Sequence, residues 1–305
     1  MSRKKALAAI IICVLVWGFS FVSTKIAVAV FPPMSLGLLR FAIALVFLYF
    51  IKLKLAPAEK LRIKDIPLLF AAGLTGVTLY FFCENNGIYF VSASEASIAI
   101  SSIPALTMIT DWLAGKISGS RRKRMAHNEE RHEPPRTGAR QWIGCFVSIA
   151  GVWLVAGVSF ALSGSVTGYI YMTGAALSWV AYSFLTRPLF VNRSGIYIAF
   201  WQSVAGFICF IPFSVIELQN WGEANAQVII HLLFLAIFCS AIGYWFYVRA
   251  LENLGVSVCA IFINLIPVVT VIAGFFMLGD RLTPLQWLGA AFVITGVYLA
   301  IWEKK

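Results

Sequence analysis

The sequence predicts an all-α integral membrane protein in which ten transmembrane helices form two five-helix repeats of inverted topology. Three observations support this fold class. Hydrophobic residues make up 60% of the 305 residues and charged residues 12%, and the mean hydropathy is +0.86. A soluble domain could not bury that much apolar surface, so lipid must cover it. Apolar stretches of membrane-spanning length recur along the chain, and several motifs occur once in each half.

Ten apolar stretches approach the ~20 residues that a helix needs to cross the hydrocarbon core. Each is expected to be helical, because unpaired backbone groups cannot face lipid. The first follows a basic start, as in a signal peptide, but its length and the nine later spans favour an uncleaved helix. The six cysteines lie within these stretches and are interpreted as packing residues. The predicted spans are 6–30, 34–51, 66–87, 94–113, 142–158, 168–186, 196–216, 228–248, 256–278 and 285–302.

The loops between these spans indicate the orientation of the chain. Of the 24 Lys and Arg residues, 21 lie in one set of alternate loops and at the two ends, whereas the opposite set holds only Arg281. Because basic loops stay in the cytoplasm, both termini are expected to be cytoplasmic. The net charge of +11 therefore reflects membrane orientation, and no nucleic-acid partner is expected.

The two halves of the chain resemble each other. Trp17 and Trp179 begin similar segments, and Gln-Trp-Ile-Gly at 141–144 recurs as Gln-Trp-Leu-Gly at 286–289. Five spans per repeat is an odd number, so the second copy must enter the membrane from the other side. We expect one repeat at 1–158 and the other at 168–305.

The spacing of the repeated motifs also locates an insertion in the first half, at about 118–140. It lies in a predicted cytoplasmic loop and is rich in basic residues. We interpret it as a solvated, flexible segment, with a regulatory or partner-docking segment as the alternative.

A proline interrupts one span in each half. At helical spacing, Ser101 and Pro104 belong to one polar stripe, and Asn264 and Pro267 belong to the matching stripe. Paired interrupted helices, one per half of a hydrophobic chain, indicate a binding site between two repeats.

Further motifs follow one another along the chain. They are Trp-Gly-Phe-Ser-Phe at 17–21, Leu-Leu-Arg-Phe at 38–41, Ile-Pro-Ala-Leu at 103–106, Tyr-Val-Arg-Ala-Leu at 247–251, Ile-Pro-Val-Val at 266–269 and Gly-Asp-Arg-Leu at 279–282. In this order the chain resembles the EamA-type transporters of the drug/metabolite transporter (DMT) superfamily. It departs from them at 116–117, where such repeats usually have a Gly-Glu-type turn.

The resemblance implies ten helices, two inverted halves and a central cavity. It also implies movement of small metabolites, often amino acids or related compounds and frequently outward. The expected location is the bacterial cytoplasmic (inner) membrane. The expected partners are a small-molecule substrate and the lipid bilayer, with no cofactor or metal.

Charged residues within spans are the first candidates for a substrate site, because each costs about 2.5–3.5 kcal/mol on insertion scales. Arg40 lies a turn or two into the second span, and its guanidinium suits a carboxylate. Its repeat partner is Gln202. Glu84 could neutralise Lys25 or Arg40 and carry a proton, so coupling to protons is a hypothesis. For Lys25 the alternative is that the side chain reaches the outer headgroups. Asp111, near an inner helix end, is expected to pair with a loop arginine.

Aromatic and small polar residues complete the predicted site. As repeat mates, Trp17 and Trp179 are expected to face each other and to hold an apolar or cationic group. Most aromatic residues in membrane proteins serve packing, and small polar residues also join helices, so these assignments have structural alternatives. The predicted substrate-binding residues are Trp17, Ser20, Arg40, Glu84, Ser101, Trp179, Tyr182, Gln202, Tyr244 and Asn264.

We therefore expect a secondary transporter that exports an amino acid or a related zwitterion or weak acid by alternating access. The alternatives are a membrane-embedded enzyme and a transporter of nucleotide sugars or drug-like molecules. An enzyme would need paired acids, a nucleophile with a base, or a metal set. The spans contain one aspartate, Asp111, and an isolated histidine, His231, so no catalytic residue is predicted. A phosphate-binding loop for ATP is also missing from the sequence.

Overall fold

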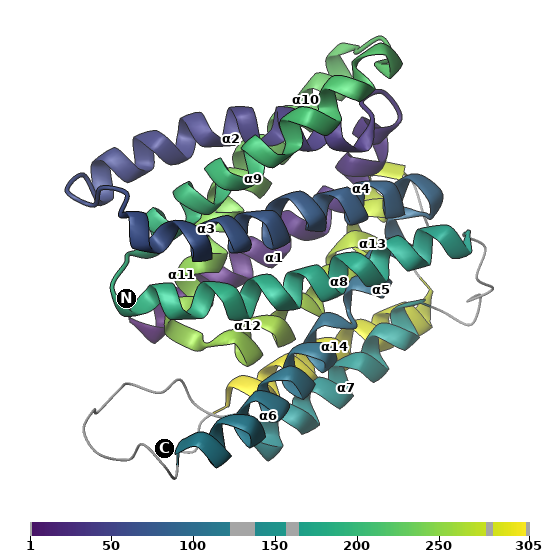
Figure 1. Cartoon of the computed structure of the whole chain (residues 1–305). Helices are drawn as coiled ribbons and strands as arrows, with labels where there is room; N and C mark the ends of the chain where they lie inside the picture. Colours follow the sequence, from purple (N-terminus) through teal and green to yellow (C-terminus); the bar gives the residue numbers. More distant parts are fainter. Residues whose placement is uncertain (1, 123–137, 157–164, 279–282, 303–305) are drawn as a thin grey trace.

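The computed structural model describes residues 2–122, 138–156, 165–278 and 283–302, and this part of the chain forms helices and no strands. In Figure 1, α2, α9 and α10 lie along one edge of the molecule and α6, α7 and α14 along the opposite edge, with α1 and α8 between them. The helices of the first half are α1 (Arg3–Val28), α2 (Pro33–Leu55), η1 (Ile63–Asp65), α3 (Ile66–Gly73), η2 (Leu74–Leu79), α4 (Tyr80–Phe90), α5 (Ala93–Ile100), α6 (Ile103–Arg122) and α7 (Ala139–Ala156). Those of the second half are α8 (Val166–Thr186), η3 (Arg187–Val191), α9 (Gly195–Glu217), η4 (Leu218–Asn220), α10 (Ala226–Phe234), η5 (Leu235–Gly243), α11 (Tyr244–Leu254), α12 (Val256–Ile263), α13 (Leu265–Leu278) and α14 (Pro284–Ile301).

Eight helical stretches in the described residues are long and apolar enough to cross a membrane. Five of them combine several elements: η1 through α4, α5 with part of α6, α9 with η4, α10 through α11, and α12 with most of α13. The two other predicted spans, 142–158 and 168–186, are the helices α7 and α8, which fall below these length or hydropathy limits. An integral, multi-pass membrane protein follows from these stretches. Most of the predicted insertion at 118–140 lies outside the described residues.

Both predicted helix breaks are present. α5 ends at Ile100 and α12 ends at Ile263, and each end lies four residues before a proline, Pro104 or Pro267. A proline ring clashes with the carbonyl of the residue four positions earlier and supplies no N–H to it, so the α-helix stops at that residue. The same local rule acts in both halves, and each half contains an eight-residue helix followed by a longer one.

Two π-helical segments were not predicted. η2 (Leu74–Leu79) and η5 (Leu235–Gly243) lie within the predicted spans 66–87 and 228–248. Each is followed by an eleven-residue α-helix that begins with a tyrosine, Tyr80 in α4 and Tyr244 in α11. π-helical turns occur mostly as single insertions in α-helices and frequently at functional sites.

Equivalent helices of the two halves pack in opposite directions. In the pair α2 and α9, Glu217 at the end of α9 accepts the backbone N–H of Ser35 at the start of α2, at 2.7 Å. At the other end of this pair, Lys52 of α2 lies over the ring of Phe200 in α9. The two helices are therefore antiparallel.

The pair α7 and α14 packs through glycines. A side chain on Gly144 would meet the backbone of Gly296, and one on Gly151 would meet the backbone of Gly289, so these helices are antiparallel as well. Gly144 and Gly289 are the last residues of the repeated Gln-Trp-Ile/Leu-Gly motif. Small residues allow helix backbones to approach closely in a membrane, and this packing explains the repeated motif.

The ends of the described chain meet. Arg3 at the start of α1 donates a hydrogen bond from Nη2 to the carbonyl of Ile301 at the end of α14, at 2.9 Å. The first and last helices thus start and finish at the same end of the bundle.

Candidate functional site

A cavity in the middle of the helix bundle is lined by three helices from each half. α1, α2 and α4 contribute from the first half, and α8, α11 and α13 from the second. The lining residues are Trp17, Ser20, Phe21, Arg40, Tyr80, Phe81, Glu84, Trp179, Tyr244 and Ile266. The volume of the cavity is about 20 Å³. This space is enough for about one or two waters.

Arg40 is the cation of this cavity. Its side chain comes from α2 and is 2% exposed. The guanidinium carbon lies 4.2 Å from the centroid of the Phe81 ring, and Nε donates a hydrogen bond to Ser240 Oγ at 3.3 Å. Nη1 is buried and has no hydrogen-bond partner. A buried, incompletely bonded guanidinium is costly unless an anion completes its hydrogen bonds.

Glu84 is the anion of the same cavity. It comes from α4, is 4% exposed and accepts a hydrogen bond from the hydroxyl of Tyr80 at 2.8 Å. It does not pair with Lys25. Lys25 donates instead from Nζ to the carbonyls of Ile88, Tyr89 and Val91, at 2.7, 3.1 and 2.8 Å. These carbonyls end α4, where a positive charge is favourable, so Lys25 has a helix-capping position.

The aromatic wall of the cavity is built around two tryptophans. The rings of Trp17 and Trp179 meet edge-on with centroids 5.1 Å apart, so the two indoles contact each other directly. Trp17 Nε1 donates to the carbonyl of Cys239 at 3.1 Å. Trp179 Nε1 donates to the hydroxyl of Tyr247 at 3.0 Å. Both indole N–H groups are thereby satisfied, and the ring faces and edges remain for an apolar group.

The two π-helical segments connect the halves at the cavity. Arg40 of the first half donates to Ser240 in η5, which belongs to the second half. In the reverse direction, the hydroxyl of Tyr244 donates to the carbonyl of Gly76 in η2. A π-helical turn displaces carbonyls from the usual helix ladder, and these segments offer acceptors to the opposite half.

Six of the ten predicted site residues line the cavity: Trp17, Ser20, Arg40, Glu84, Trp179 and Tyr244. Tyr182 and Gln202 lie behind its wall. The Tyr182 ring packs 5.0 Å from that of Trp179, and Gln202 Nε2 donates to the Tyr182 hydroxyl at 2.9 Å. These two residues support Trp179 from behind.

Ser101 and Asn264 lie at the helix breaks and do not line the cavity. Ser101 Oγ donates to the carbonyl of Ile98 in its own helix, at 2.6 Å. Asn264 Nδ2 donates to Ser148 Oγ of α7, at 2.6 Å. The Ser101 bond stays within its own helix, whereas the Asn264 bond joins the break after α12 to α7.

The family was established by comparison with known proteins. A model described as the EamA-like transporter family matches residues 4–120 and, a second time, residues 166–302. The chain belongs to the EamA-like transporter family. This finding confirms the resemblance drawn from the motifs and identifies the protein as a membrane transporter.

This EamA-like transporter aligns with several curated relatives over nearly the whole length of both chains. One is named "Probable terminal-alkyne amino-acid exporter", from Streptantibioticus cattleyicolor, and is 25% identical over 98% of this chain and 94% of its own length. Another is named "Probable amino-acid metabolite efflux pump", from Escherichia coli, and is 25% identical over 100% of this chain and 98% of its own. A crystal structure with 16% identity covers 98% of both chains with a TM-score of 0.71, so the fold is one already observed.

Four residues that line the cavity of this EamA-like transporter were not predicted: Phe21, Tyr80, Phe81 and Ile266. Tyr80 and Phe81 precede Glu84 by four and three residues, and side chains at these spacings share one face of a helix. That spacing was the available signal for Tyr80 and Phe81. Phe21 and Ile266 belong to motifs already singled out, next to Ser20 and Pro267.

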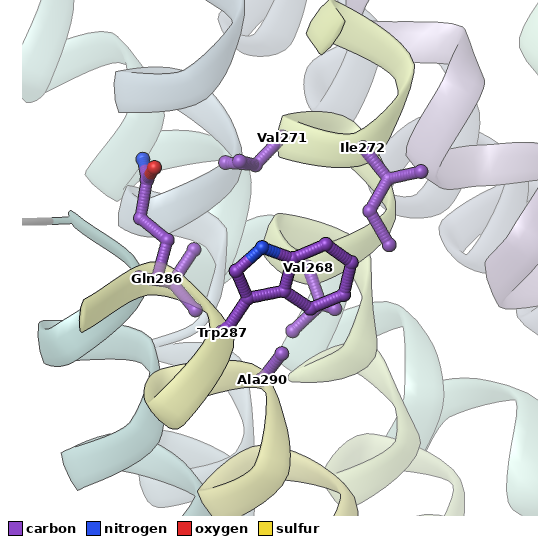
Figure 2. A pocket seen from close by; sticks show the side chains of 7 residues that line it. Val268, Val271, Ile272, Gln286, Trp287 and Ala290 are labelled. Carbon is purple, nitrogen blue, oxygen red and sulfur yellow. The ribbon is translucent and has the colours of Figure 1, made fainter. Parts of the chain in front are cut away.

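A second pocket lies between α7, α13 and α14 (Figure 2). Its lining is apolar except for the amide of Gln286 and the indole N–H of Trp287, and Figure 2 shows the Gln286 side chain turned away from the Trp287 ring. The Gln286 amide oxygen accepts the backbone N–H of Thr283 in the capping box of α14, at 2.9 Å. Trp287 is 59% exposed. This pocket is lined by no charged side chain, whereas Arg40 and Glu84 both line the central cavity, which favours the central cavity as the candidate site.

Proposed function

We propose that this EamA-like transporter is a secondary transporter that exports a small carboxylated metabolite, an amino acid or a related zwitterion or weak acid. The observation that carries the proposal is the unpartnered Nη1 of Arg40 in the central cavity. A guanidinium in this position provides a planar hydrogen-bond donor for a carboxylate. The names of the two relatives above, an amino-acid exporter and an amino-acid metabolite efflux pump, support the same class of substrate and the outward direction.

The proposed architecture has ten membrane-spanning helices, with α7 and α8 added to the eight stretches described above. It consists of two inverted repeats, at 1–158 and 168–305. Two observations support the inversion: the family model matches twice, and the equivalent pairs α2/α9 and α7/α14 are antiparallel. We place both termini in the cytoplasm of a bacterium, with the chain in the inner membrane. The contact between Arg3 and Ile301 is compatible with termini on one side.

Alternating access is the proposed mechanism. A cavity of about 20 Å³ is too small for an amino acid, so the halves must move apart to admit substrate. A contact between the halves lies at the proposed cytoplasmic end. There the carboxylate of Asp65 pairs with the guanidinium of Arg193 and accepts a hydrogen bond from the hydroxyl of Tyr197, at 3.0 Å. Inward opening would have to break this contact.

Coupling to protons is part of the proposal, with Glu84 as the carrier. The test is the flux into liposomes of a substrate that raises the melting temperature of the protein, measured with and without a pH gradient. Equal flux in the two conditions would contradict proton coupling and indicate facilitated transport.

The test of the binding site uses two arginine variants of the purified protein. Thermal stabilisation across a panel of amino acids, nucleosides and sugars first finds a carboxylated substrate. Arg40→Gln is then expected to weaken its binding by about 10- to 100-fold, because a charge-assisted hydrogen bond is worth about 1.5–3 kcal/mol. Arg62→Gln is the matched control, since the Arg62 side chain is exposed. Unchanged transport of a carboxylated substrate by a folded Arg40→Gln variant would contradict the proposed site.

A further inference from the structure

We infer that the cavity binds two charged groups of the substrate, one at Arg40 and one at Glu84, and we call Glu84 the second pole. Glu84 binds the ammonium group of the substrate while Arg40 binds its carboxylate, so the transporter selects zwitterions with the two groups on one carbon atom over simple weak acids. This inference rests on the proposed function and narrows its substrate class. It also assigns Tyr80 as the residue that positions Glu84.

The first observation is that two opposite charges line one cavity without pairing with each other. Arg40 and Glu84 are 2% and 4% exposed, and both face the same small space. Among the residues that the structure describes, they form no ion pair: Arg40 donates to Ser240 and Glu84 accepts from Tyr80. Buried charges are normally paired. Two that stay separate across a cavity leave one donor and one acceptor for a ligand that carries both complementary charges.

The second observation is the placement of the two charges. The guanidinium of Arg40 lies against the ring of Phe81. Phe81 precedes Glu84 by three residues in α4, and this spacing places both side chains on one face of the helix. The guanidinium therefore contacts the face of α4 that carries Glu84, and both groups line the same small cavity. A ligand that reaches both must carry its ammonium and its carboxylate close together, as on one carbon atom.

The third observation is that Tyr80 fixes the carboxylate and leaves it available. One oxygen of Glu84 accepts the Tyr80 hydroxyl at 2.8 Å, and the other has no hydrogen bond to a described residue. The Tyr80 ring is itself held, with centroids 4.8 Å from Trp179 and 5.1 Å from Phe81. An ammonium group has three donors, and the free oxygen of Glu84 can accept one of them.

A ligand with only one charged group is expected to bind weakly, because it leaves one of the two buried charges, Arg40 or Glu84, without a partner. A weak acid on Arg40 would bring a second negative charge beside Glu84, and an amine on Glu84 would bring a second positive charge beside Arg40. Only a zwitterion neutralises both buried side chains at once. The aromatic wall of Trp17, Trp179 and Tyr244 then receives the apolar side chain.

The experiment compares matched ligands on the full-length protein in detergent. The first set is leucine, 4-methylpentanoate, which lacks the amino group, and 3-methylbutylamine, which lacks the carboxylate. Equivalent sets built on methionine and phenylalanine guard against a poor fit of one side chain. Binding is measured by thermal stabilisation and by exchange of radiolabelled amino acid in liposomes.

The wild-type protein is expected to bind an amino acid at least about tenfold more tightly than either of its analogues, since each lost charged hydrogen bond is worth about one decade or more. Glu84→Gln is expected to remove the preference for the amino acid over the des-amino acid. Arg40→Gln is expected to weaken both of these carboxylates. Glu223→Gln, the same chemical change in an exposed loop, is expected to leave all affinities unchanged.

Tyr80→Phe tests the positioning role. It is expected to lower amino-acid affinity several-fold while the des-amino acid binds as before. A general loss of packing would lower both affinities together. Tyr49→Phe is the control, because Tyr49 is 47% exposed.

Two outcomes overturn the inference, and they are distinguishable. If carboxylates bind in an Arg40-dependent way but Glu84→Gln keeps the full preference for the amino acid, the second pole is wrong and the proposed function stands. If no carboxylate binds or moves at all, both the proposed function and the second pole fail.

Discussion

The indole of Trp17 packs edge-on against the indole of Trp179, with the ring centroids 5.1 Å apart. One ring comes from α1 and the other from α8, the first helix of each half. The contact therefore joins the two halves directly at the wall of the cavity. It is the aromatic counterpart of the hydrogen bonds that Arg40 and Tyr244 make to the π-helical segments.

Trp179→Phe is predicted to destabilise the protein by about 2 kcal/mol, because it removes the hydrogen bond to Tyr247 and leaves a void in the wall. The melting temperature in detergent should fall, and transport should fall with it. Trp287→Phe, at a position that is 59% exposed, should change stability by less than about 0.5 kcal/mol. Equal losses in the two variants would argue against a special role for the indole of Trp179.

Asp65→Asn is predicted to weaken the contact between the halves at Arg193 by about 1–3 kcal/mol, the range for a hydrogen bond to a charged group. The Arg193→Gln variant should cost a similar amount, and the double variant should cost less than the sum of the two, because the side chains act as a pair. The melting temperatures of the wild type, the two single variants and the double variant give the coupling free energy between Asp65 and Arg193. If the two effects add, the pair does not stabilise the closed arrangement. Accelerated labelling of a cysteine placed in the cavity would further indicate more frequent inward opening in Asp65→Asn.

Gly151→Ala is predicted to separate α7 from α14. The added Cβ would lie 2.6 Å from the backbone nitrogen of Val293 and 2.7 Å from the carbonyl oxygen of Gly289, and backbone atoms cannot give way cheaply. A loss of about 1–3 kcal/mol is expected from this overpacking. Ala150→Val is the control, since Ala150 is the neighbouring residue and is exposed on the outside of α7. Denaturation by heat or detergent provides the comparison, and an unchanged Gly151→Ala protein would contradict the packing.

Asn264→Ala separates a structural role from a role in binding. Because the Asn264 amide donates to Ser148 and lies outside the cavity lining, we expect a loss of stability of about 1–2 kcal/mol. Substrate affinity in the surviving folded protein should be unchanged. A tenfold loss of affinity with an unchanged melting temperature would place Asn264 in the substrate site after all.

The features that follow from local rules were predictable. The helix breaks at Ile100 and Ile263 follow from proline chemistry four residues away. The encounter of Trp17 with Trp179 follows from their equivalent places in the two repeats. Arg40 was selected because a charge within an apolar span costs free energy, and a functional role accounts for that cost.

The features that depend on helix register were not predictable. Tyr80 lies in the aromatic run Tyr80–Phe82, and the face of this run that meets the cavity is set by the π-helical segment just before it. Nothing in the sequence of residues 74–79 marks that segment. Ser101 and Asn264 illustrate the reverse problem, because a polar residue at a helix break looks the same in sequence whether it contacts a ligand or a neighbouring helix. From the sequence we expected Lys25 to pair with Glu84 or to reach the lipid headgroups. It donates instead to backbone carbonyls at the end of α4, and the position of backbone carbonyls cannot be read from side-chain identities.

The π-helical segments have a geometric consequence for both halves. A turn closed by bonds between residues five apart holds more residues than an α-helical turn. If one such segment tightened to α geometry, the following helix would rotate about its axis by roughly 100° for each residue displaced. In α4 this rotation would carry Tyr80 and Glu84 together, and in α11 it would carry Tyr244 and Tyr247. A one-residue shift in hydrogen bonding would thus turn an aromatic, charged lining away from the centre of the molecule without unfolding the helix that carries it.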